Sequence, residues 1–250
     1  MSDVIGELDM GGRTAVVTGG SNGIGEAIAT ALTQQGANVL VLDREPHRTF
    51  EVLEADLAQP SAVTDAARQI ADRLGTPDIL VNCAGVCPTT PLDGLDLAAF
   101  TAVQQVNLHA PVALMAAFGP AMARAGYGRM VNVSSVHATT SEPGYLAYAV
   151  SKAGLEAATR SVAVELGAAG VLANAVAPGF VRTRMSIVDG VDEHDSDWFR
   201  DVYVAGGQLP IAQPAMPADI AAMAAWLASD ANSYVTGQTI RVDGGMGIRL

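Results

Sequence analysis

Cysteine and histidine are scarce in this sequence. It contains two cysteines, Cys83 and Cys87, and four histidines among its 250 residues. Two cysteines are too few for a disulfide framework, and the histidines do not have metal-ligand spacing. We therefore expect free thiols that behave as small apolar side chains, and no bound metal.

Positive charge is also scarce. The chain has 14 Lys and Arg residues against 26 Asp and Glu residues, which gives a net charge of −12. Nucleic acids and anionic membrane surfaces require a basic footprint, so we expect neither as a partner. The start of the chain carries acidic residues and glycines, unlike a secretory signal, and no apolar run reaches the ~18 residues of a membrane span. These features predict a cytoplasmic enzyme with a small-molecule ligand.

Apolar residues, 50% of the chain, recur in strand-like runs that alternate with Ala-rich segments of helical length. The runs are residues 13–18, 38–43, 50–56, 78–82, 128–135, 171–178 and 239–245. The helical segments are residues 23–35, 61–74, 96–125, 147–168 and 217–229. This order predicts a single α/β domain over residues 1–250, a Rossmann-type doubly wound parallel sheet of about seven strands with helices on both faces. Residues 182–212 lack such a pattern, which is typical of an irregular loop over a ligand.

A glycine-rich turn, TGGSNGIG at residues 18–25, follows the first strand and opens the first helix. Glycines there let the backbone approach a pyrophosphate, whose charge then faces the amides of the helix N-terminus. The second strand ends in Asp43, at about the distance expected for a carboxylate that binds the adenosine ribose. Asp43 repels a 2′-phosphate and favours NAD. Arg44 keeps NADP open, because a guanidinium can pair with that phosphate.

Two tyrosines precede one lysine in YLAYAVSKAG, residues 145–154. Tyr148 and Tyr145 both fall on the helical face of Lys152, but the axial rise is ~6 Å for the first and ~10.5 Å for the second. Pro143-Gly144 also indicates that the helix has not begun at Tyr145. The spacing therefore favours Tyr148 as a proton carrier whose pKa the lysine lowers, with Tyr145 at the mouth of the cleft.

Eight motifs in this order resemble the short-chain dehydrogenase/reductase family, and together they span almost the whole chain. They are TGGSNGIG (18–25), EADL (54–57), NCAG (82–85), VNLHAP (106–111), VNVSS (131–135), YAVSK (148–152), APGFVRT (177–183) and VTGQTIRVDGG (235–245). The enoyl-reductase branch of the family spaces its pair Y-x6-K, which Tyr145 and Lys152 also satisfy. That branch departs from the glycine pattern seen here, so the carbonyl- and alcohol-acting branch fits better.

The resemblance implies the roles of four catalytic residues. Ser135 hydrogen-bonds the substrate oxygen, Tyr148 transfers the proton, and Lys152 lowers the pKa of Tyr148 and binds the nicotinamide ribose. Asn107 supports a water-linked proton relay to that lysine. The neighbouring Ser134 is expected to point away, because side chains alternate along a strand.

The cofactor set combines the glycine-rich turn and Asp43 with positions that the resemblance supplies. Its members are Gly19, Ser21, Asn22, Gly23, Ile24, Gly25, Asp43, Arg44, Asp56, Leu57, Asn82, Ala84, Gly85, Tyr148, Lys152, Pro178, Gly179, Val181 and Thr183. The resemblance also implies a homotetramer, or a homodimer, built through the 96–125 and 147–168 helices and the C-terminal strand.

The substrate is expected to be neutral. Residues 182–212 carry six acids, Asp189, Asp192, Glu193, Asp195, Asp197 and Asp201, which form either a solvated face or a rim that repels anions. Trp198, Phe199 and Tyr203 either wall the pocket or pack on the core. The expected substrate-binding residues are Ser135, His137, Tyr145 and Tyr148.

These features favour reversible NAD-linked oxidation of a polyol, sugar or cyclic alcohol. An NADP-dependent ketone or 3-oxoacyl-type reductase, a non-catalytic dinucleotide sensor, and a lyase or epimerase on the same fold remain alternatives.

Overall fold

A computed structural model describes residues 8–188 and 190–248 of the chain. The termini of the predicted 1–250 domain and Asp189 of the 182–212 segment lie outside the described residues. The main sheet contains seven strands in the order β3-β2-β1-β4-β5-β6-β9, and all of its pairs are parallel. The strands are β1 (Thr14–Thr18), β2 (Asn38–Asp43), β3 (Glu51–Glu54), β4 (Ile79–Asn82), β5 (Gly128–Val133), β6 (Val171–Pro178) and β9 (Thr239–Val242). The predicted doubly wound sheet is confirmed.

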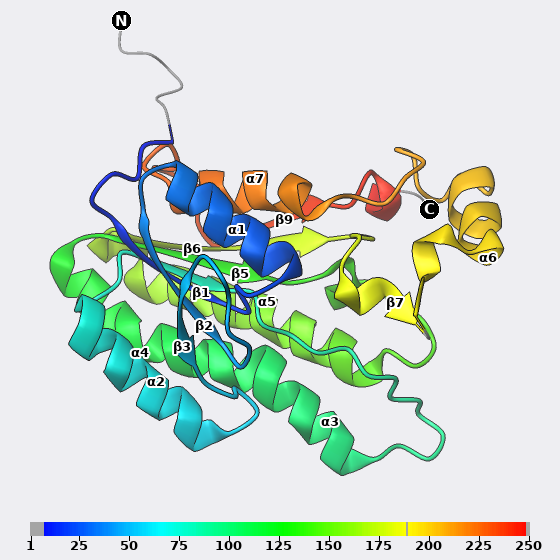
Figure 1. Cartoon of the computed structure of the whole chain (residues 1–250), viewed down its shortest axis with the longest axis horizontal. Coiled ribbons are helices and arrows are strands. Elements are labelled where there is room, and N and C mark those ends of the chain that lie inside the picture. Colours follow the sequence, from blue (N-terminus) through cyan, green and yellow to red (C-terminus); the bar gives the residue numbers. More distant parts are fainter. Residues whose placement is uncertain (1–7, 189, 249–250) are drawn as a thin grey trace, which may run out of the picture.

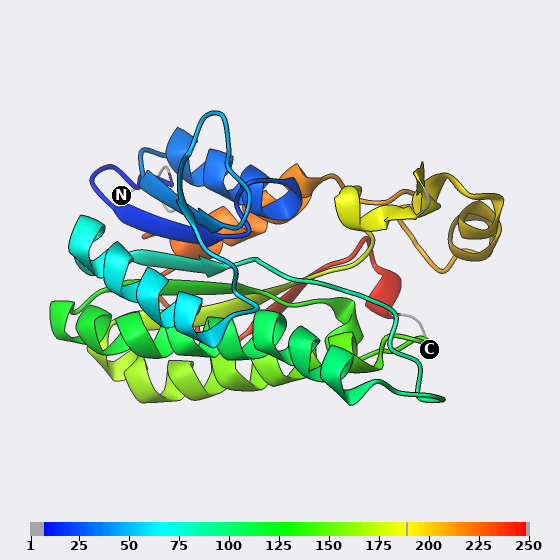
Figure 2. The ribbon, with the colours of Figure 1, turned by 60° about the horizontal axis from the view of Figure 1, so that its bottom comes forward.

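Helices cover both faces of this sheet (Figures 1 and 2). Helices α1 (Gly23–Gln34) and α7 (Pro217–Ala228) lie on one face, and α2 (Pro60–Leu74), α4 (Ala110–Ala125) and α5 (Leu146–Leu166) lie on the other. Strand residues alternate between the two layers, because successive side chains point to opposite faces. Val17 packs with the α1 and α7 side chains, whereas Val16 packs with those of α2 and α4.

The predicted 96–125 helix is a continuous segment of three parts, α3 (Leu97–Gln104), the π-helical turn η1 (Gln105–His109) and α4. Among the described residues, Leu97–Ala125 is the one helix whose length and composition would suit a membrane span, and 44% of its apolar window is buried. Leu114, Phe118 and Met122 lie in the core layer beneath the sheet. Packing against the sheet thus accounts for the apolar character of this helix.

The 182–212 segment is ordered into short elements, contrary to the predicted irregular loop. It contains η4 (Arg184–Ser186), a hairpin of β7 (Ile187–Val188) and β8 (Val191–Asp192), then η5 (Glu193–Asp195), α6 (Asp197–Phe199) and η6 (Arg200–Ala205). Phe199, Tyr203 and Leu209 form a small core with Phe180, which holds the segment together. Trp198 is 58% exposed and is not part of it. The segment projects beyond one end of the sheet (Figure 2).

Several predicted elements differ at their ends. Strand β3 is shorter than the predicted 50–56, and β5 ends at Val133 rather than at residue 135. Ser134 and Ser135 leave the sheet and lead into the 3₁₀ turn η2 (Val136–Ala138). Strand β9 likewise ends at Val242, before the predicted residue 245. The carboxyl ends of the parallel strands share one edge of the sheet, and ligands bind in such sheets at that edge, near the point between β1 and β4 where the strand order reverses.

A buried chain of polar side chains joins β4, β5 and α5. Asn82 Nδ2 donates to Asn132 Oδ1 at 2.8 Å, and Asn132 Nδ2 donates to Thr159 Oγ1 at 2.8 Å. The Thr159 hydroxyl donates onward to the Leu155 carbonyl oxygen. All three polar residues are fully buried, so each hydrogen bond replaces water that the interior excludes.

Thr159→Val should therefore destabilise the fold, because it keeps the shape of the side chain and removes the acceptor of the Asn132 amide. A buried donor left without its acceptor costs about 1–3 kcal/mol, which urea denaturation measures. Thr64→Val is the matched control, because Thr64 is exposed on α2 and its hydroxyl donates to the Pro60 carbonyl oxygen within its own helix. Equal urea midpoints for the two variants would contradict this role of the buried chain.

Candidate active site

The glycine-rich turn between β1 and α1 permits backbone contacts that no other residue allows. A Cβ atom at Gly19 would lie 2.7 Å from Ala84 Cα, and one at Gly25 would lie 2.1 Å from the Gly19 carbonyl oxygen. Asn22 precedes the helix, but its side chain does not cap it. The N–H groups of the first turn therefore remain able to bind an anion such as a pyrophosphate.

Asp43 is held beside this turn by backbone donors. Its Oδ2 accepts from the Ser21 N–H at 3.0 Å, and its Oδ1 accepts from the Glu45 N–H at 3.1 Å. The Ser21 hydroxyl donates to the Glu45 carbonyl oxygen. Each carboxylate oxygen has further lone pairs, so the group can also accept from ribose hydroxyls. Arg44 is exposed next to it.

The turn after β4 lies against the glycine-rich turn at Gly19, and Thr18 positions it. The Thr18 hydroxyl oxygen accepts from the Cys83 and Ala84 N–H groups, each at 3.0 Å. Sequence reasoning missed Thr18, although its place at the end of β1 could have indicated it. Within the part of the chain that the structure describes, Asn82 Oδ1 is buried without a hydrogen-bond donor. Leu57 is buried in the core layer between the sheet and helices α2 and α4. Asp56 Oδ1 accepts from the Ala58 N–H.

The segment after β6 lies beside the start of α1. A Cβ atom at Gly179 would lie 3.0 Å from Asp243 Cα, so only glycine lets the chain follow β9 closely. Val181 is buried, and the Thr183 methyl group lies 3.4 Å from the position of a Gly23 Cβ atom. Pro178 ends β6. The residues predicted to bind the two ends of a dinucleotide thus lie along one edge of the sheet. The close glycine contacts and the N-terminus of α1, which has no side-chain cap, both fit such a cofactor.

Tyr148 and Lys152 lie one turn apart on α5, as predicted. The Lys152 Nζ atom is 5.5 Å from the Tyr148 ring centroid and donates to the Val133 carbonyl oxygen at 2.7 Å. Lys152 is only 3% exposed. A Cβ atom at Gly85 would lie 3.6 Å from Nζ and 3.5 Å from Asn107 Oδ1, so this glycine separates the two side chains.

The two serines after β5 face different surroundings. The Ser134 hydroxyl donates to Glu156 Oε1 at 2.8 Å in the interior. The Ser135 hydroxyl oxygen accepts from the His137 N–H at 3.2 Å, and it also acts on the Tyr148 phenol. Ser135 is therefore the serine beside the tyrosine, as expected, but both serines lie beyond the end of β5, so strand alternation does not extend to them.

Tyr145 precedes the first residue of α5, as the Pro143-Gly144 break predicts. Its ring stacks on His137 with 4.7 Å between the centroids and meets Tyr148 edge-on at 6.5 Å. His137, Tyr145 and Tyr148 thus form one aromatic wall. Desolvation by burial lowers the pKa of His137, so its imidazole is neutral near pH 7.

Burial shifts the pKa values of the central pair in opposite directions, because it disfavours the charged form of each group. It raises the pKa of Tyr148, with a further increase from nearby Cys87 and an opposing effect of the Ser135 hydroxyl. It lowers the pKa of Lys152 to about 8. The lowered tyrosine pKa predicted from the sequence is therefore not seen. The Lys152 ammonium group donates to the Val133 carbonyl oxygen. Desolvation by burial is the largest influence on the phenol and raises the pKa of Tyr148.

Asn107 lies in the π-helical turn η1, and its side chain is occupied by protein groups. Its Oδ1 accepts from the Val86 N–H at 2.9 Å, while its Nδ2 donates to the Val86 carbonyl oxygen and to Ser151 Oγ. These bonds fix the loop after β4 to α5. The proton-relay role stays a prediction.

The two cysteines are free, and burial raises the pKa of Cys83 to about 12 and that of Cys87 to about 11. Both are therefore protonated and unreactive near neutral pH. In residues 8–188 and 190–248, no group of three potential ligand side chains is close enough to hold a metal ion.

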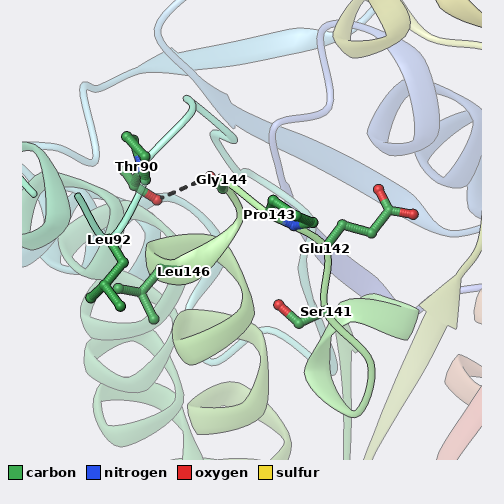
Figure 3. A pocket seen from close by; sticks show the side chains of 8 residues that line it. Thr90, Leu92, Ser141, Glu142, Pro143, Gly144 and Leu146 are labelled. Atoms are coloured by element: carbon green, nitrogen blue, oxygen red, sulfur yellow. Dashed lines mark hydrogen bonds between the residues drawn. The ribbon is translucent and has the colours of Figure 1, made fainter.

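A cavity of about 330 Å³ flanks this site (Figure 3). It lies where the chain before α3 meets the chain before α5, and its lining includes Thr90, Leu92, Pro143 and Leu146. The Thr90 N–H donates to the Gly144 carbonyl oxygen at 2.7 Å, and the Thr90 hydroxyl oxygen accepts from the Ala147 N–H at 3.0 Å. Thr90 thus fixes the start of α5, a positioning role that sequence reasoning missed.

Known proteins match nearly the whole chain. The family model described as enoyl-(acyl carrier protein) reductase matches residues 19–247. A 3-oxoacyl-(acyl-carrier-protein) reductase of Rickettsia conorii is 33% identical over 96% of this chain and 98% of its own length. An acetoacetyl-CoA reductase of Allochromatium vinosum is 32% identical over 94% of this chain and 98% of its own length.

Solved structures also match. A putative NAD(P)-dependent gluconate 5-dehydrogenase from Beutenbergia cavernae with bound NADP has a TM-score of 0.89 and 35% identity, covering 98% of this chain and 100% of its own. A gluconate 5-dehydrogenase from Burkholderia cenocepacia in complex with NADP and tartrate has a TM-score of 0.88 and 28% identity, covering 98% of each chain.

The lowered pKa of Lys152 predicts a dependence of stability on pH. Between about 8, its pKa in the fold, and its ordinary value of 10.5, the unfolded chain binds more protons at this group than the folded chain does. Stability due to Lys152 should therefore rise with pH across this window. Relative to Lys152→Met, the wild type should gain about 1–2 kcal/mol between pH 7 and 9.5, since one pKa unit is worth ~1.4 kcal/mol.

Urea denaturation of both proteins across this pH range measures the difference. The shared contributions of the cysteines and of Tyr148 largely cancel in the comparison. A difference that stays flat, or that falls as pH rises, would show that Lys152 keeps its ordinary pKa.

Proposed function

Because the chain belongs to the short-chain dehydrogenase/reductase family, we propose that it catalyses reversible NAD-linked hydride transfer between a secondary alcohol and a ketone. The family resemblance of the sequence is confirmed, and the protein is an oxidoreductase that uses a nicotinamide dinucleotide. The observation that carries the proposal is the grouping of Ser135, Tyr148 and Lys152 beside the glycine-rich turn. We also propose that residues 1–250 form one nucleotide-binding domain.

In this mechanism the bound dinucleotide supplies or accepts the hydride. Ser135 donates a hydrogen bond to the substrate oxygen, and Tyr148 moves a proton to or from that oxygen. Lys152, held by the Val133 carbonyl oxygen, places its ammonium group beside the phenol and within reach of the nicotinamide ribose. Asn107 holds the loop after β4, which passes close to the Lys152 Nζ atom at Gly85. Tyr145 and His137 orient the remainder of the substrate from the aromatic wall.

NAD is the proposed cofactor, since Asp43 presents a carboxylate where a 2′-phosphate would lie. The backbone bonds from Ser21 and Glu45 support this by holding the carboxylate in place. NADP is the alternative, because solved relatives hold it and Arg44 is exposed beside Asp43.

The proposed substrate is a neutral polyol, sugar or cyclic alcohol. The acidic composition of the chain and the acidic 182–212 segment support it. Reduction of a 3-oxoacyl thioester is the second candidate, which the names of the 3-oxoacyl and acetoacetyl-CoA reductase relatives favour.

We also propose a cytoplasmic homotetramer, or a homodimer. Exposed apolar side chains on α4 and α5, Val112, Val150 and Val164, support assembly through these helices, because apolar surface of this kind is commonly covered by another subunit.

Two single substitutions test the assignment of the proton carrier. Tyr148→Phe should lower kcat about 10²- to 10⁴-fold, the usual contribution of general acid–base catalysis. Tyr145→Phe should mainly raise KM, because it removes a hydroxyl group that can bind substrate at the wall, while the ring keeps its stack on His137. Absorbance at 340 nm with NAD and NADP against polyols, cyclic alcohols and β-keto esters measures both. A Tyr148→Phe enzyme with unchanged turnover would contradict the role of Tyr148 as proton carrier, whereas a wild type without turnover on any of these substrates would favour a non-catalytic sensor.

Asp43→Asn should shift cofactor preference towards NADP. The amide removes the negative charge next to the 2′-position, and on the order of a tenfold change in the NADP/NAD ratio of kcat/KM corresponds to ~1.4 kcal/mol. Glu54→Gln, at the register position opposite Asp43 on β3, is the matched control and should leave the ratio unchanged. Faster turnover of the wild type with NADP would overturn the assignment of Asp43.

A further inference from the structure

Two side chains of α5 hold two successive residues where β5 ends. Lys152 Nζ donates to the Val133 carbonyl oxygen at 2.7 Å. One turn further along the helix, Glu156 Oε1 accepts from the Ser134 hydroxyl at 2.8 Å. Residues four apart share one face of a helix, and this face is buried at both positions. Helix α5 thus holds the chain at the two residues that directly precede Ser135.

Packing does not explain Glu156. The residue is 7% exposed, and a buried carboxylate is strongly disfavoured unless hydrogen bonds satisfy it. An apolar residue of similar size in place of a buried charge commonly leaves stability unchanged or raises it. Stability alone would therefore favour an apolar side chain here, so the carboxylate indicates a function for the hydrogen bond with Ser134.

This bond holds the chain at the point where it leaves the sheet. Val133 is the last residue of β5, and the Ser134 N–H donates to the Val176 carbonyl oxygen of β6 at 2.7 Å. Ser135 is extended, with a φ of −167° and a ψ of 157°, and it precedes the turn η2. The bond from the Ser134 hydroxyl to Glu156 therefore ties the chain to α5 directly before this turn.

The turn η2 adjoins the proposed proton carrier. The His137 ring of this turn meets the Tyr148 ring edge-on, with 6.1 Å between the centroids. The His137 N–H donates to the Ser135 hydroxyl oxygen at 3.2 Å, which leaves the hydroxyl hydrogen able to donate to a substrate oxygen. Any shift of Ser134 moves Ser135 with it, because the two residues are covalently joined. The attachment of Ser134 thus controls where this donor lies relative to Tyr148.

We propose that Glu156 is a positioning residue of the active site, which holds Ser134 and thereby keeps the Ser135 hydroxyl in place beside Tyr148. Lys152 holds one residue of the same two-residue segment, and Glu156 holds the other. This inference rests on the proposed alcohol–ketone activity, in which the serine and tyrosine hydroxyl groups bind the same substrate oxygen. Misplacement of such a group by ~1 Å can lower a rate about 100-fold.

The test uses variants of the full-length enzyme with the alcohol or β-keto ester that the wild type converts fastest in the assay at 340 nm. Glu156→Leu and Ser134→Ala should each lower kcat about 10- to 100-fold. The KM of the substrate and the Kd of NADH, measured by fluorescence titration, should stay near the wild-type values, because the aromatic wall and the glycine-rich turn are unchanged. Glu156→Gln keeps an oxygen acceptor for the Ser134 hydroxyl and should restore kcat to within about threefold of the wild type.

The double variant shows whether the two residues act through their shared bond. Glu156→Leu with Ser134→Ala should be no slower than the slower single variant, because the effects of residues that act as a unit are not additive. Replacing both partners of a buried hydrogen bond with apolar groups is nearly neutral for stability. The double variant should therefore keep a urea midpoint close to that of the wild type while its kcat stays low.

Thr159→Val is the matched control for a merely structural role. It removes another buried hydrogen bond of α5 and should lower the urea midpoint without lowering the kcat of the folded enzyme. Wild-type kcat in Glu156→Leu, an equal loss of kcat in Thr159→Val, or additive losses in the double variant would overturn the inference. A wild type that converts no alcohol or ketone with either dinucleotide would instead overturn the proposed function.

Discussion

The hydrogen bond from Lys152 Nζ to the Val133 carbonyl oxygen fixes the geometry on which the candidate active site depends. It joins the second turn of α5 to the last residue of β5, where the chain leaves the sheet. Tyr148, one turn earlier on α5, is thereby placed opposite Ser135, two residues beyond Val133. A buried ammonium group requires such an acceptor, because an unpaired charge in the interior is strongly disfavoured. The same bond thus gives the lysine an acceptor and ties together the two elements that carry the candidate active site.

Backbone contacts through glycine join this half of the site to the dinucleotide half. Gly85 passes between Asn107 and Lys152, and Gly19 lies against Ala84 of the same turn after β4. A side chain at Gly19 would push the turn after β4 away from β1, because its Cβ atom would lie 2.7 Å from Ala84 Cα. The sheet brings the strand ends to one edge, but these contacts determine how closely the cofactor and catalytic groups approach.

Periodicity in the sequence predicted a parallel sheet of about seven strands with helices on both faces, because strands and helices repeat with local periods. Spacing also favours Tyr148 over Tyr145 as the proton carrier, which stays a prediction. The structure of the 182–212 segment could not be predicted in this way. The small core that holds this segment together combines Phe180, Phe199 and Tyr203. The spacing of these three residues matches neither a helical nor a strand repeat across the whole segment.

The pKa of Tyr148 shows most clearly where sequence reasoning reaches its limit. A neighbouring lysine predicts a lowered value, yet burial raises the pKa of the phenol and lowers that of Lys152 to about 8. Both shifts favour neutral forms, so burial by itself makes the tyrosine a poor base. Positive charge or hydrogen-bond donors brought next to the phenol act in the opposite direction. The protein fold therefore positions the proposed proton carrier, while the basicity of its phenol depends on the groups that bind beside it.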